Sequence, residues 1–354
     1  MKKVEILETT LRDGSYAINY AFTSADTSII SKELEDAGFE YIEIGHGVGL
    51  NASNKGYGEA AQTDEEYIIA ANSVLKKAKF GMFCIPGIAR LEDVDMAAEN
   101  GMGFIRIGTN VTEVPNSEPF IKKAREAGMF VAANFMKSYV LPPKEFAEQV
   151  KLSQKYGSQM IYIVDSAGGM FAEDINNYYN AIREVSDLPV GFHGHDNLGL
   201  AVSNSLEAAK IGIEFVDSSL QGLGRSAGNA GTEILIAALL KKGYDLNLNF
   251  LKIFDIGQKY IQPLLTLKGR PPLDVITGYA DFHSSYMRHI HKYSAKYSVN
   301  PILLIIEMCK IDKVHLDEEK LDKVAQKIKK DEEIYLARYD FSKYVGGEQD
   351  EKKS

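Results

Sequence analysis

Eight short apolar runs alternate with longer amphipathic segments along residues 1–245 of this 354-residue chain. Each run has the length and composition of a buried strand, and each precedes a helical pattern. The expected strands are residues 4–8, 41–45, 80–84, 104–108, 129–134, 160–164, 188–193 and 214–218. Strand–helix alternation repeated in this way predicts an α/β fold of the (β/α)8 TIM barrel type. An open doubly wound sheet is the structural alternative.

The segment after the first expected strand illustrates the helical pattern. Ser24 is expected to cap this helix. Ile30, Leu34 and Ala37 fall on one face at helical spacing, and Gly38 is expected to end the helix.

Beyond residue 245 the pattern becomes purely helical. We therefore predict a catalytic barrel over residues 1–245 and a C-terminal helical extension over residues 246–345. The last residues, 346–354, read as a polar tail that is frayed at its end.

The composition favours small-molecule chemistry. A formal net charge of −9 argues against nucleic acid or an anionic membrane as the main partner, because both attract clustered Lys and Arg. The two cysteines, Cys84 and Cys309, make no disulfide framework. The first residues lack the apolar core of a signal peptide, and no apolar run reaches the roughly 18 residues that span a bilayer. We expect a cytoplasmic protein.

Two histidines stand at the end of the seventh expected strand, in the stretch GFHGHDNLGL. Residues i and i+2 of a strand point to the same face, so His193 and His195 leave the strand in one direction. In a parallel barrel the catalytic groups lie where strands end, and Asp13 follows the first strand. Asp13, His193 and His195 are therefore predicted to bind a divalent cation: Mn²⁺, Mg²⁺, Fe²⁺, Co²⁺ or Zn²⁺. The alternative is a polar strand end whose imidazoles bond to nearby carbonyls.

Other polar residues follow the strands. Arg12 is suited to grip a carboxylate or a developing enolate through two donors, or else forms a salt bridge to a strand-end acid such as Glu43. Asn229 either adds a metal ligand or caps the eighth helix, and the cap is slightly favoured. The stretch DSAGGM offers the Ser166 hydroxyl and a run of backbone N–H groups for a carboxylate, although its glycines alone explain a turn.

Two stretches resemble a known group of metal-dependent aldolases and condensing enzymes: TTLRDGSYAINYAFT, and the region that runs from HGHDNLGL to SAGNAGTE. Within the group, EIGHGVGL, IPGIAR, IVDSAGG and the tail YVGGEQD are most similar to the pyruvate-specific class II branch, the 4-hydroxy-2-oxovalerate aldolase-like family.

The resemblance implies specific roles. Asp13, His193 and His195 would hold the metal, with Mn²⁺ as the first expectation and Mg²⁺, Co²⁺ or Zn²⁺ as alternatives. Arg12 would steady a pyruvate enolate, and Ser166 would hold the oxo-acid end of the substrate. His46, after the second strand, is expected to contact the substrate. The implied reaction is reversible aldol cleavage of a 4-hydroxy-2-oxo acid to pyruvate and an aldehyde, beneath an extension that covers the barrel mouth.

The chain departs from the family pattern at three positions. Tyr16 stands where the family has a catalytic histidine, and Val48 replaces an acid. His283, in DFHSSY, stands where the aldolases have a tyrosine. We expect Tyr16 and His283 to have exchanged places as the catalytic pair, or else His283 packs among the helices and Tyr16 reflects a different substrate.

Two other functions remain open from the sequence. One is a Claisen-type acyl-CoA condensing enzyme of the isopropylmalate or homocitrate synthase kind. The other is a non-catalytic barrel that binds a partner through its extension, as related aldolases pair with an aldehyde dehydrogenase. An aldehyde dehydrogenase partner or a homo-oligomer formed through the C-terminal helices is also possible for the aldolase. The sequence does not identify the aldehyde.

Overall fold

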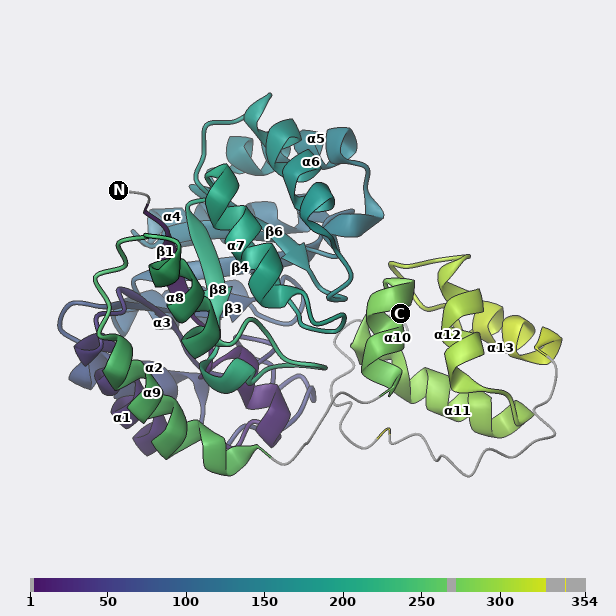
Figure 1. The fold of residues 1–354 in the computed structure, drawn as a ribbon, viewed down its shortest axis with the longest axis horizontal. Coiled ribbons are helices and arrows are strands. Elements are labelled where there is room, and N and C mark those ends of the chain that lie inside the picture. The colour runs from purple at the N-terminus through teal and green to yellow at the C-terminus, as the bar shows by residue number, and fades with distance from the viewer. Residues whose placement is uncertain (1–2, 266–271, 329–340, 342–354) are drawn as a thin grey trace.

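Parallel strands in sequence order close into a barrel in this computed structural model, which describes residues 3–265, 272–328 and 341 (Figure 1). The strands are β1 Glu5–Glu8, β2 Tyr41–Glu43, β3 Lys79–Cys84, β4 Phe104–Asn110, β5 Phe130–Met136, β6 Met160–Asp165, β7 Val190–Gly194 and β8 Phe215–Ser218. Parallel pairing of β1 with β8 closes the sheet, which rules out the open doubly wound alternative. The (β/α)8 prediction is confirmed, and each expected strand is present with its ends shifted by a few residues.

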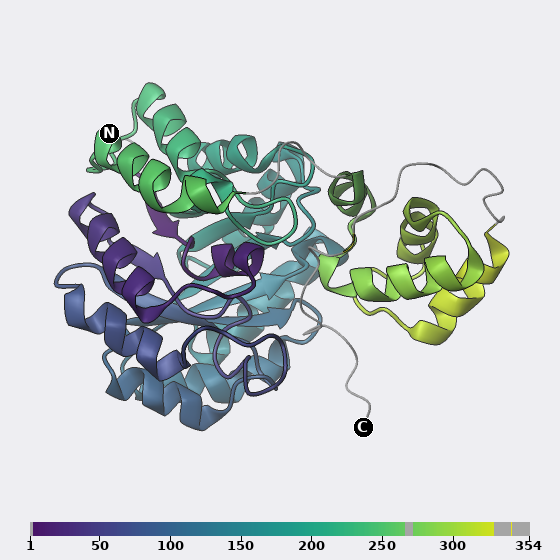
Figure 2. The same ribbon diagram turned by 90° about the horizontal axis from the view of Figure 1, so that it is seen from below.

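A ring of helices surrounds the strands (Figure 2). These helices are α1 Ser24–Asp36, α2 Asp64–Val74, α3 Leu91–Glu99, α4 Glu118–Glu126, α5 Pro143–Tyr156, α6 Ala172–Arg183, α7 Ala201–Ile211 and α8 Thr232–Lys241. The predicted cap of α1 is wrong by one residue. Thr23, not Ser24, accepts the backbone N–H of Asp26, and the Asp26 side chain in turn accepts the N–H of Thr23. This reciprocal capping box satisfies two N–H groups, which a cap at Ser24 would not do.

The C-terminal helices form a second body with its own apolar core. The helices are α10 Pro272–Ala280, α11 Met287–Tyr297, α12 Pro301–Cys309 and α13 Glu318–Lys327. By contrast, α9, Phe250–Ile256, contributes Ile253 and Ile256 to the barrel core. The division of the chain at residues 245 and 346 stays a prediction. Helix α9 falls within the predicted extension but packs in the barrel core. The YVGGEQD stretch and the polar tail fall outside the described residues.

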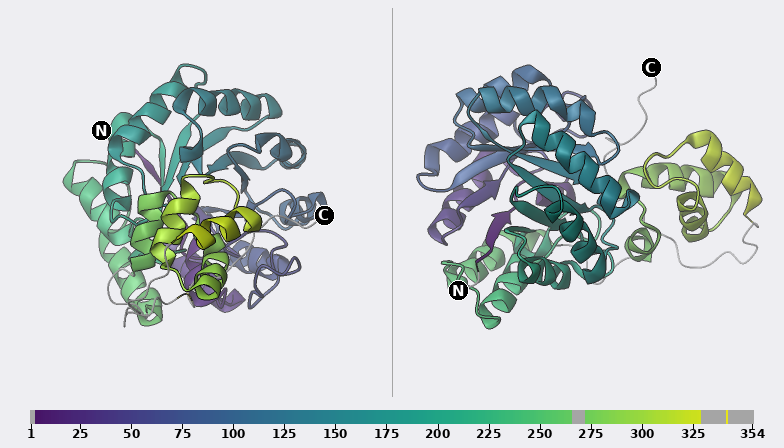
Figure 3. Two further views of the ribbon diagram at one scale, coloured as in Figure 1. Left: turned by 90° about the vertical axis from the view of Figure 1, so that its right-hand side faces the viewer. Right: turned by 90° about the horizontal axis from the view of Figure 1, so that it is seen from above.

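The extension lies across the C-terminal end of the barrel (Figure 3). Several hydrogen bonds join the two bodies, among them the following three. Asn197 Nδ2 donates to Thr277 Oγ1 at 2.6 Å, Lys137 Nζ donates to the Val314 carbonyl at 2.6 Å, and Arg225 Nε donates to Ser284 Oγ at 3.0 Å. Each barrel residue follows the end of a strand, so the extension covers the face that carries the site. Within the described residues, no helix has both the length and the apolar character to cross a membrane.

Candidate metal centre

Three predicted ligands converge at the barrel mouth. Asp13 follows β1 in a short 3-10 helix, whereas His193 and His195 lie at the end of β7. One ligand atom from each residue lies within 4.8 Å of the others, and all three side chains are buried. The i, i+2 spacing places both imidazoles on one side of β7, and barrel closure brings β1 to the same end.

Hydrogen bonds orient both imidazoles. His193 Nδ1 lies 2.8 Å from Asp217 Oδ2, and His195 Nδ1 lies 3.2 Å from the Gly228 carbonyl. In each case Nδ1 carries the proton, since its partner is an acceptor, and the Nε2 lone pair remains for a metal. Burial lowers the pKa of His195 to about 4, so this ring is neutral near pH 7. The alternative of a polar strand end also predicted a hydrogen bond from His195 to a carbonyl. The same bond is compatible with metal binding, because it uses Nδ1 and not Nε2.

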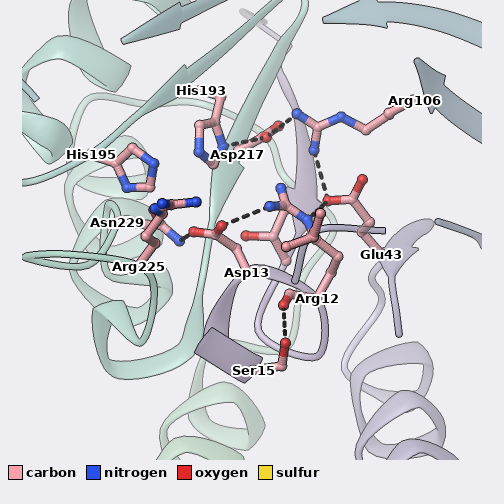
Figure 4. Close-up of polar contacts among 12 residues, drawn as sticks. Arg12, Asp13, Ser15, Glu43, Arg106, His193, His195, Asp217, Arg225 and Asn229 are labelled. Atoms are coloured by element: carbon pink, nitrogen blue, oxygen red, sulfur yellow. Dashed lines mark hydrogen bonds and ion pairs between the residues drawn. The ribbon is translucent and has the colours of Figure 1, made fainter. Parts of the chain in front are cut away.

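Asp13 is held as a carboxylate. Burial would raise its pKa, but the Arg12 charge and the two histidines outweigh burial and hold the pKa well below the usual range. Arg12 Nη1 donates to Oδ1 at 2.7 Å, and Asn229 Nδ2 donates to Oδ2 at 2.6 Å. Figure 4 shows these contacts.

The cap interpretation of Asn229 is wrong. Gly231 occupies the N-cap position of α8, and Asn229 instead pairs with Asp13. Its Oδ1 atom is buried without a hydrogen-bond partner among the described residues. A carboxylate, two imidazole lone pairs and a buried amide oxygen suit a divalent cation, so the donor set fits the expected metal.

Arg12 forms the salt bridge that was its alternative role. Its Nε atom donates to Glu43 Oε2 at 2.6 Å, while Nη1 contacts Asp13. The guanidinium is thereby fixed beside the metal ligands. A fixed donor of this kind is also what stabilisation of an enolate requires, so the two roles are compatible.

Ser166 directly follows β6, and His46 follows β2. Ser166 is half-buried, and its Oγ accepts the backbone N–H of Lys137 at 2.9 Å, which leaves the hydroxyl proton to donate. His46 is buried, stacked on Tyr20 with ring centres 3.8 Å apart. Its Nδ1 accepts the Val48 N–H at 3.1 Å, and its Nε2 lies 3.1 Å from the Gly58 carbonyl. Contact of either residue with a substrate stays a prediction.

Three backbone N–H groups of DSAGGM already have acceptors within the stretch, the first being Gly168, which donates to the Asp165 carbonyl at 3.2 Å. Gly169 and Met170 donate to the two oxygens of Asp165 at 3.0 and 2.9 Å. The suggestion that these amides bind a substrate carboxylate is therefore wrong, and the stretch forms a turn around its own acid. Burial raises the pKa of Asp165 to about 7.

Arg225 connects the predicted catalytic pair. Its guanidinium carbon lies 4.8 Å from the centre of the Tyr16 ring, and its Nε donates to Ser284, the neighbour of His283. His283 is buried, and burial followed by the charges of Arg225 and Lys137 lowers its pKa well below the usual value. Ser285 Oγ lies 2.7 Å from His283 Nδ1. The structure thus links Tyr16 and His283 to one cation, and their shared catalytic role stays a prediction.

Three residues at the site were not predicted from the sequence. Asp217 orients His193, and Arg106 pairs with Asp217 and Glu43. Arg225 joins the barrel to Ser284 of the extension. Arg106 did leave a signal, because it interrupts the apolar strand run FIRIG. Asp217 is the penultimate residue of β8, and Asp165 is the last residue of β6, so the same strand-end rule would have selected Asp217.

A barrel with an Asp–His–His cluster at its C-terminal end defines a class of metal-dependent (β/α)8 enzymes. The chain belongs to the HMGL-like family, whose model matches residues 3–259. It is 38% identical to the 4-hydroxy-2-oxovalerate aldolase of Carboxydothermus hydrogenoformans over 93% of this chain and 98% of that protein. It is also 38% identical to the Moorella thermoacetica protein of the same name, over 87% of this chain and 91% of that one.

Solved structures share the fold. Hydroxymethylglutaryl-CoA lyase from Pseudomonas aeruginosa matches with a TM-score of 0.64 at 21% identity, over 76% of this chain and 95% of that one. The carboxyl transferase domain of Rhizobium etli pyruvate carboxylase matches with a TM-score of 0.75 at 17% identity, over 92% of this chain and 60% of that one. At these identities the likeness extends to the fold alone. The relatives in sequence make the chain an enzyme of the aldolase class, a carbon–carbon lyase.

Proposed function

We propose that this chain is a divalent-metal-dependent aldolase that cleaves or forms a 4-hydroxy-2-oxo acid through a pyruvate enolate. The observation that carries the proposal is the buried Asp13–His193–His195 cluster with the Arg12 guanidinium fixed against it. The relatives named 4-hydroxy-2-oxovalerate aldolase support the choice of substrate class.

Asp13, His193 and His195 would hold the cation, with the Asn229 amide oxygen as a candidate fourth ligand. The bound cation supplies a positive charge that favours the negative charge developing on the 2-oxo oxygen. Mn²⁺ is our choice among the metals that accept mixed oxygen and nitrogen donors.

Arg12 and Ser166 would position the oxo acid. The Arg12 guanidinium lies beside the metal ligands, where it donates to the oxygen that becomes negative in the enolate. Ser166 donates its hydroxyl proton to the carboxylate, and its oxygen is held by the Lys137 N–H. No lysine Schiff base is needed for this reaction.

Tyr16 and His283 would handle the proton of the C4 hydroxyl. Burial lowers the pKa of His283, so the ring is unprotonated, although the same shift weakens it as a base. An imidazole is still a better proton acceptor than a neutral Tyr hydroxyl. His283→Ala should reduce aldol cleavage steeply and leave Mn²⁺ affinity unchanged. The exchange variant Tyr16→His with His283→Tyr should recover part of the activity. If His283→Ala releases pyruvate from the aldol substrate as fast as the parent does, His283 has no part in the reaction.

Pyruvate enolisation is the direct test, because it does not require the aldehyde to be known. The chain should exchange the methyl protons of pyruvate for deuterium when Mn²⁺ is added, and a chelator should stop the exchange. His195→Ala, which removes one ligand, should bind Mn²⁺ weakly and exchange at the background rate. If the metal-free protein exchanges pyruvate as fast as the loaded protein, the proposed reaction is wrong.

The two other functions receive no support from the sequence relatives, whose names are those of aldolases. Thiol release from acetyl-CoA with a 2-oxo acid would revive the condensing enzyme. A cytoplasmic location, an aldehyde dehydrogenase partner and a homo-oligomer stay predictions, and co-purification with size measurement tests the last two.

A further inference from the structure

Arg106 lies within β4, and its side chain is fully buried inside the barrel. A buried charge is costly unless it is paired and hydrogen-bonded. Arg106 Nη1 donates to Glu43 Oε2 at 3.0 Å, Nη2 forms an ion pair with Asp217 Oδ2 at 2.7 Å, and Nε donates to Asn134 Oδ1 at 3.2 Å. One guanidinium therefore bridges two carboxylates that come from β2 and β8.

The Glu43 branch leads to one side of the metal centre. Glu43 Oε2 accepts from Arg106 and also from Arg12 Nε, at 2.6 Å. Arg12 in turn donates to Asp13. Glu43 is buried, so Arg106 and Arg12 together hold this carboxylate in one orientation.

The Asp217 branch leads to the other side. Asp217 Oδ2 lies between Arg106 Nη2 and His193 Nδ1, which is 2.8 Å away. Asp217 Oδ2 accepts the Nδ1 proton of His193, and this contact selects the tautomer whose Nε2 can bind a metal. The two branches form a chain of contacts that begins and ends at metal ligands (Figure 4).

Aromatic rings hold the Arg106 guanidinium in place. Its central carbon lies 4.3 Å from the centre of the Tyr162 ring and 5.9 Å from that of Phe83. Two glycines make room for these rings, because a Cβ at Gly191 would lie 2.4 Å from Tyr162 and a Cβ at Gly108 would lie 2.3 Å from Phe83. A planar guanidinium stacks in this space, and a Lys ammonium offers no plane and no fork.

We propose that Arg106 is the positioning residue that couples the two halves of the site, fixing Arg12 through Glu43 and His193 through Asp217. The enolate part of this inference rests on the proposed function, whereas the metal part does not. Arg106 touches neither the metal ligands nor the substrate directly, and acts through the two carboxylates.

Arg106→Lys is the first test, because it keeps the charge and loses the bridge. Mn²⁺ affinity, measured by titration with electron paramagnetic resonance, should weaken by roughly 10- to 100-fold, as for other outer-shell partners. The kcat of pyruvate deuterium exchange should fall by about 10²- to 10³-fold, as when one preorganised donor is lost. In the metal-free protein, ¹⁵N NMR of His193 should show one tautomer in the parent and a mixture in the variant.

Two further variants separate the branches. Glu43→Gln should lower the kcat of exchange and leave the His193 tautomer unchanged, because it loosens Arg12 while Arg106 keeps its ion pair with Asp217. Asp217→Asn should weaken Mn²⁺ binding and mix the tautomers. Arg183→Lys is the matched control, since Arg183 also stacks on a tyrosine, Tyr179, and pairs with Glu214, far from the site on α6. It should change none of these quantities.

An Arg106→Lys protein that keeps Mn²⁺ affinity and kcat within about twofold while its Tm falls would make Arg106 a packing residue and overturn the proposal. If Arg106→Lys does not fold, Glu43→Gln and Asp217→Asn test the proposal. It fails if Glu43→Gln also mixes the His193 tautomers or if Asp217→Asn leaves them unmixed. A parent that binds Mn²⁺ without exchanging pyruvate would refute the proposed function. The tautomer and affinity measurements would still test Arg106 in that case.

Discussion

At the scale of single residues, two neighbours in sequence divide the chemistry of the site. The Asp13 carboxylate lies close to both histidines and is a proposed metal ligand, whereas Arg12 donates to both Asp13 and Glu43. The 3-10 helix that begins at Asp13 directs the two side chains, and Ser15 Oγ donates to the Arg12 carbonyl at 2.7 Å at its start. The contacts with Glu43 and Asp13 therefore fix the position of the Arg12 guanidinium.

Arg12→Lys should consequently be severely impaired. A single flexible ammonium cannot keep both the Glu43 and the Asp13 contacts and also donate to the enolate. We expect the kcat of pyruvate deuterium exchange to fall by about 10²- to 10³-fold, with Mn²⁺ binding retained. Steady-state exchange kinetics on the Mn²⁺-loaded protein checks this, and a variant within about twofold of the parent would assign Arg12 to scaffolding.

At the scale of elements, a buried acid fastens the β8–α8 loop to β1. Glu8 Oε1 accepts from Thr10 Oγ1 at 2.6 Å, from the Leu220 N–H at 3.0 Å and from Thr232 Oγ1 at 3.2 Å. The loop between Leu220 and Thr232 carries Arg225 and Asn229, so Glu8 holds both ends of the loop that positions these two residues. Among the described residues, Glu8 forms no ion pair, and burial raises its pKa to about 7.

The raised pKa of Glu8 predicts a pH dependence of stability. An unfolded chain releases this proton near pH 4.5 and the folded chain near pH 7, so the folded state holds the extra proton between them. The stabilising contribution of Glu8 to the free energy of unfolding is largest below pH 4.5. It declines by about 3 kcal/mol as the pH rises to 7.

Glu8→Gln should remove this decline, because an amide does not titrate. Urea unfolding of the metal-free protein at pH 5 and pH 7 measures the difference. The exposed carboxylate variant Glu148→Gln is the control and should keep the slope of the parent. A Glu8→Gln protein whose free energy of unfolding falls as steeply as that of the parent would contradict the assignment.

At the scale of the whole molecule, the extension completes the mouth of the barrel. Lys137, at the end of β5, is fully buried, and its Nζ reaches both Tyr286 Oη at 3.3 Å and the Val314 carbonyl at 2.6 Å. Tyr286 Oη donates to the same carbonyl at 2.8 Å. The position of His283 relative to the barrel therefore depends on these hydrogen bonds and on the Arg225–Ser284 contact.

Lys137→Met should loosen the extension without unfolding the barrel. Hydrogen exchange of the α11 amides should become faster, and that of the barrel strands should stay unchanged. Aldol cleavage should fall more than pyruvate enolisation, because only cleavage needs His283. Lys122→Met, at an exposed i, i+4 ion pair on α4, is the control. Equal loss of both reactions would place Lys137 in the pyruvate site instead.

The sequence alone determined the barrel and the three predicted ligands. The strands were readable because an apolar run between helical patterns is a local property of the chain. His193 and His195 were readable because strand geometry sends i and i+2 to one face, and Asp13 because strand ends of a parallel barrel meet. These arguments use only local geometry and one topological rule.

Tertiary structure decided which polar groups pair. The Arg106 bridge joins carboxylates from β2 and β8, and Arg225 joins Tyr16 to the extension, although these residues lie far apart in sequence. Asn229 does not cap α8 but donates to Asp13, because the β8–α8 loop brings it next to the residues that follow β1. A buried polar group takes whichever partner barrel closure brings within reach, and no local pattern records that choice.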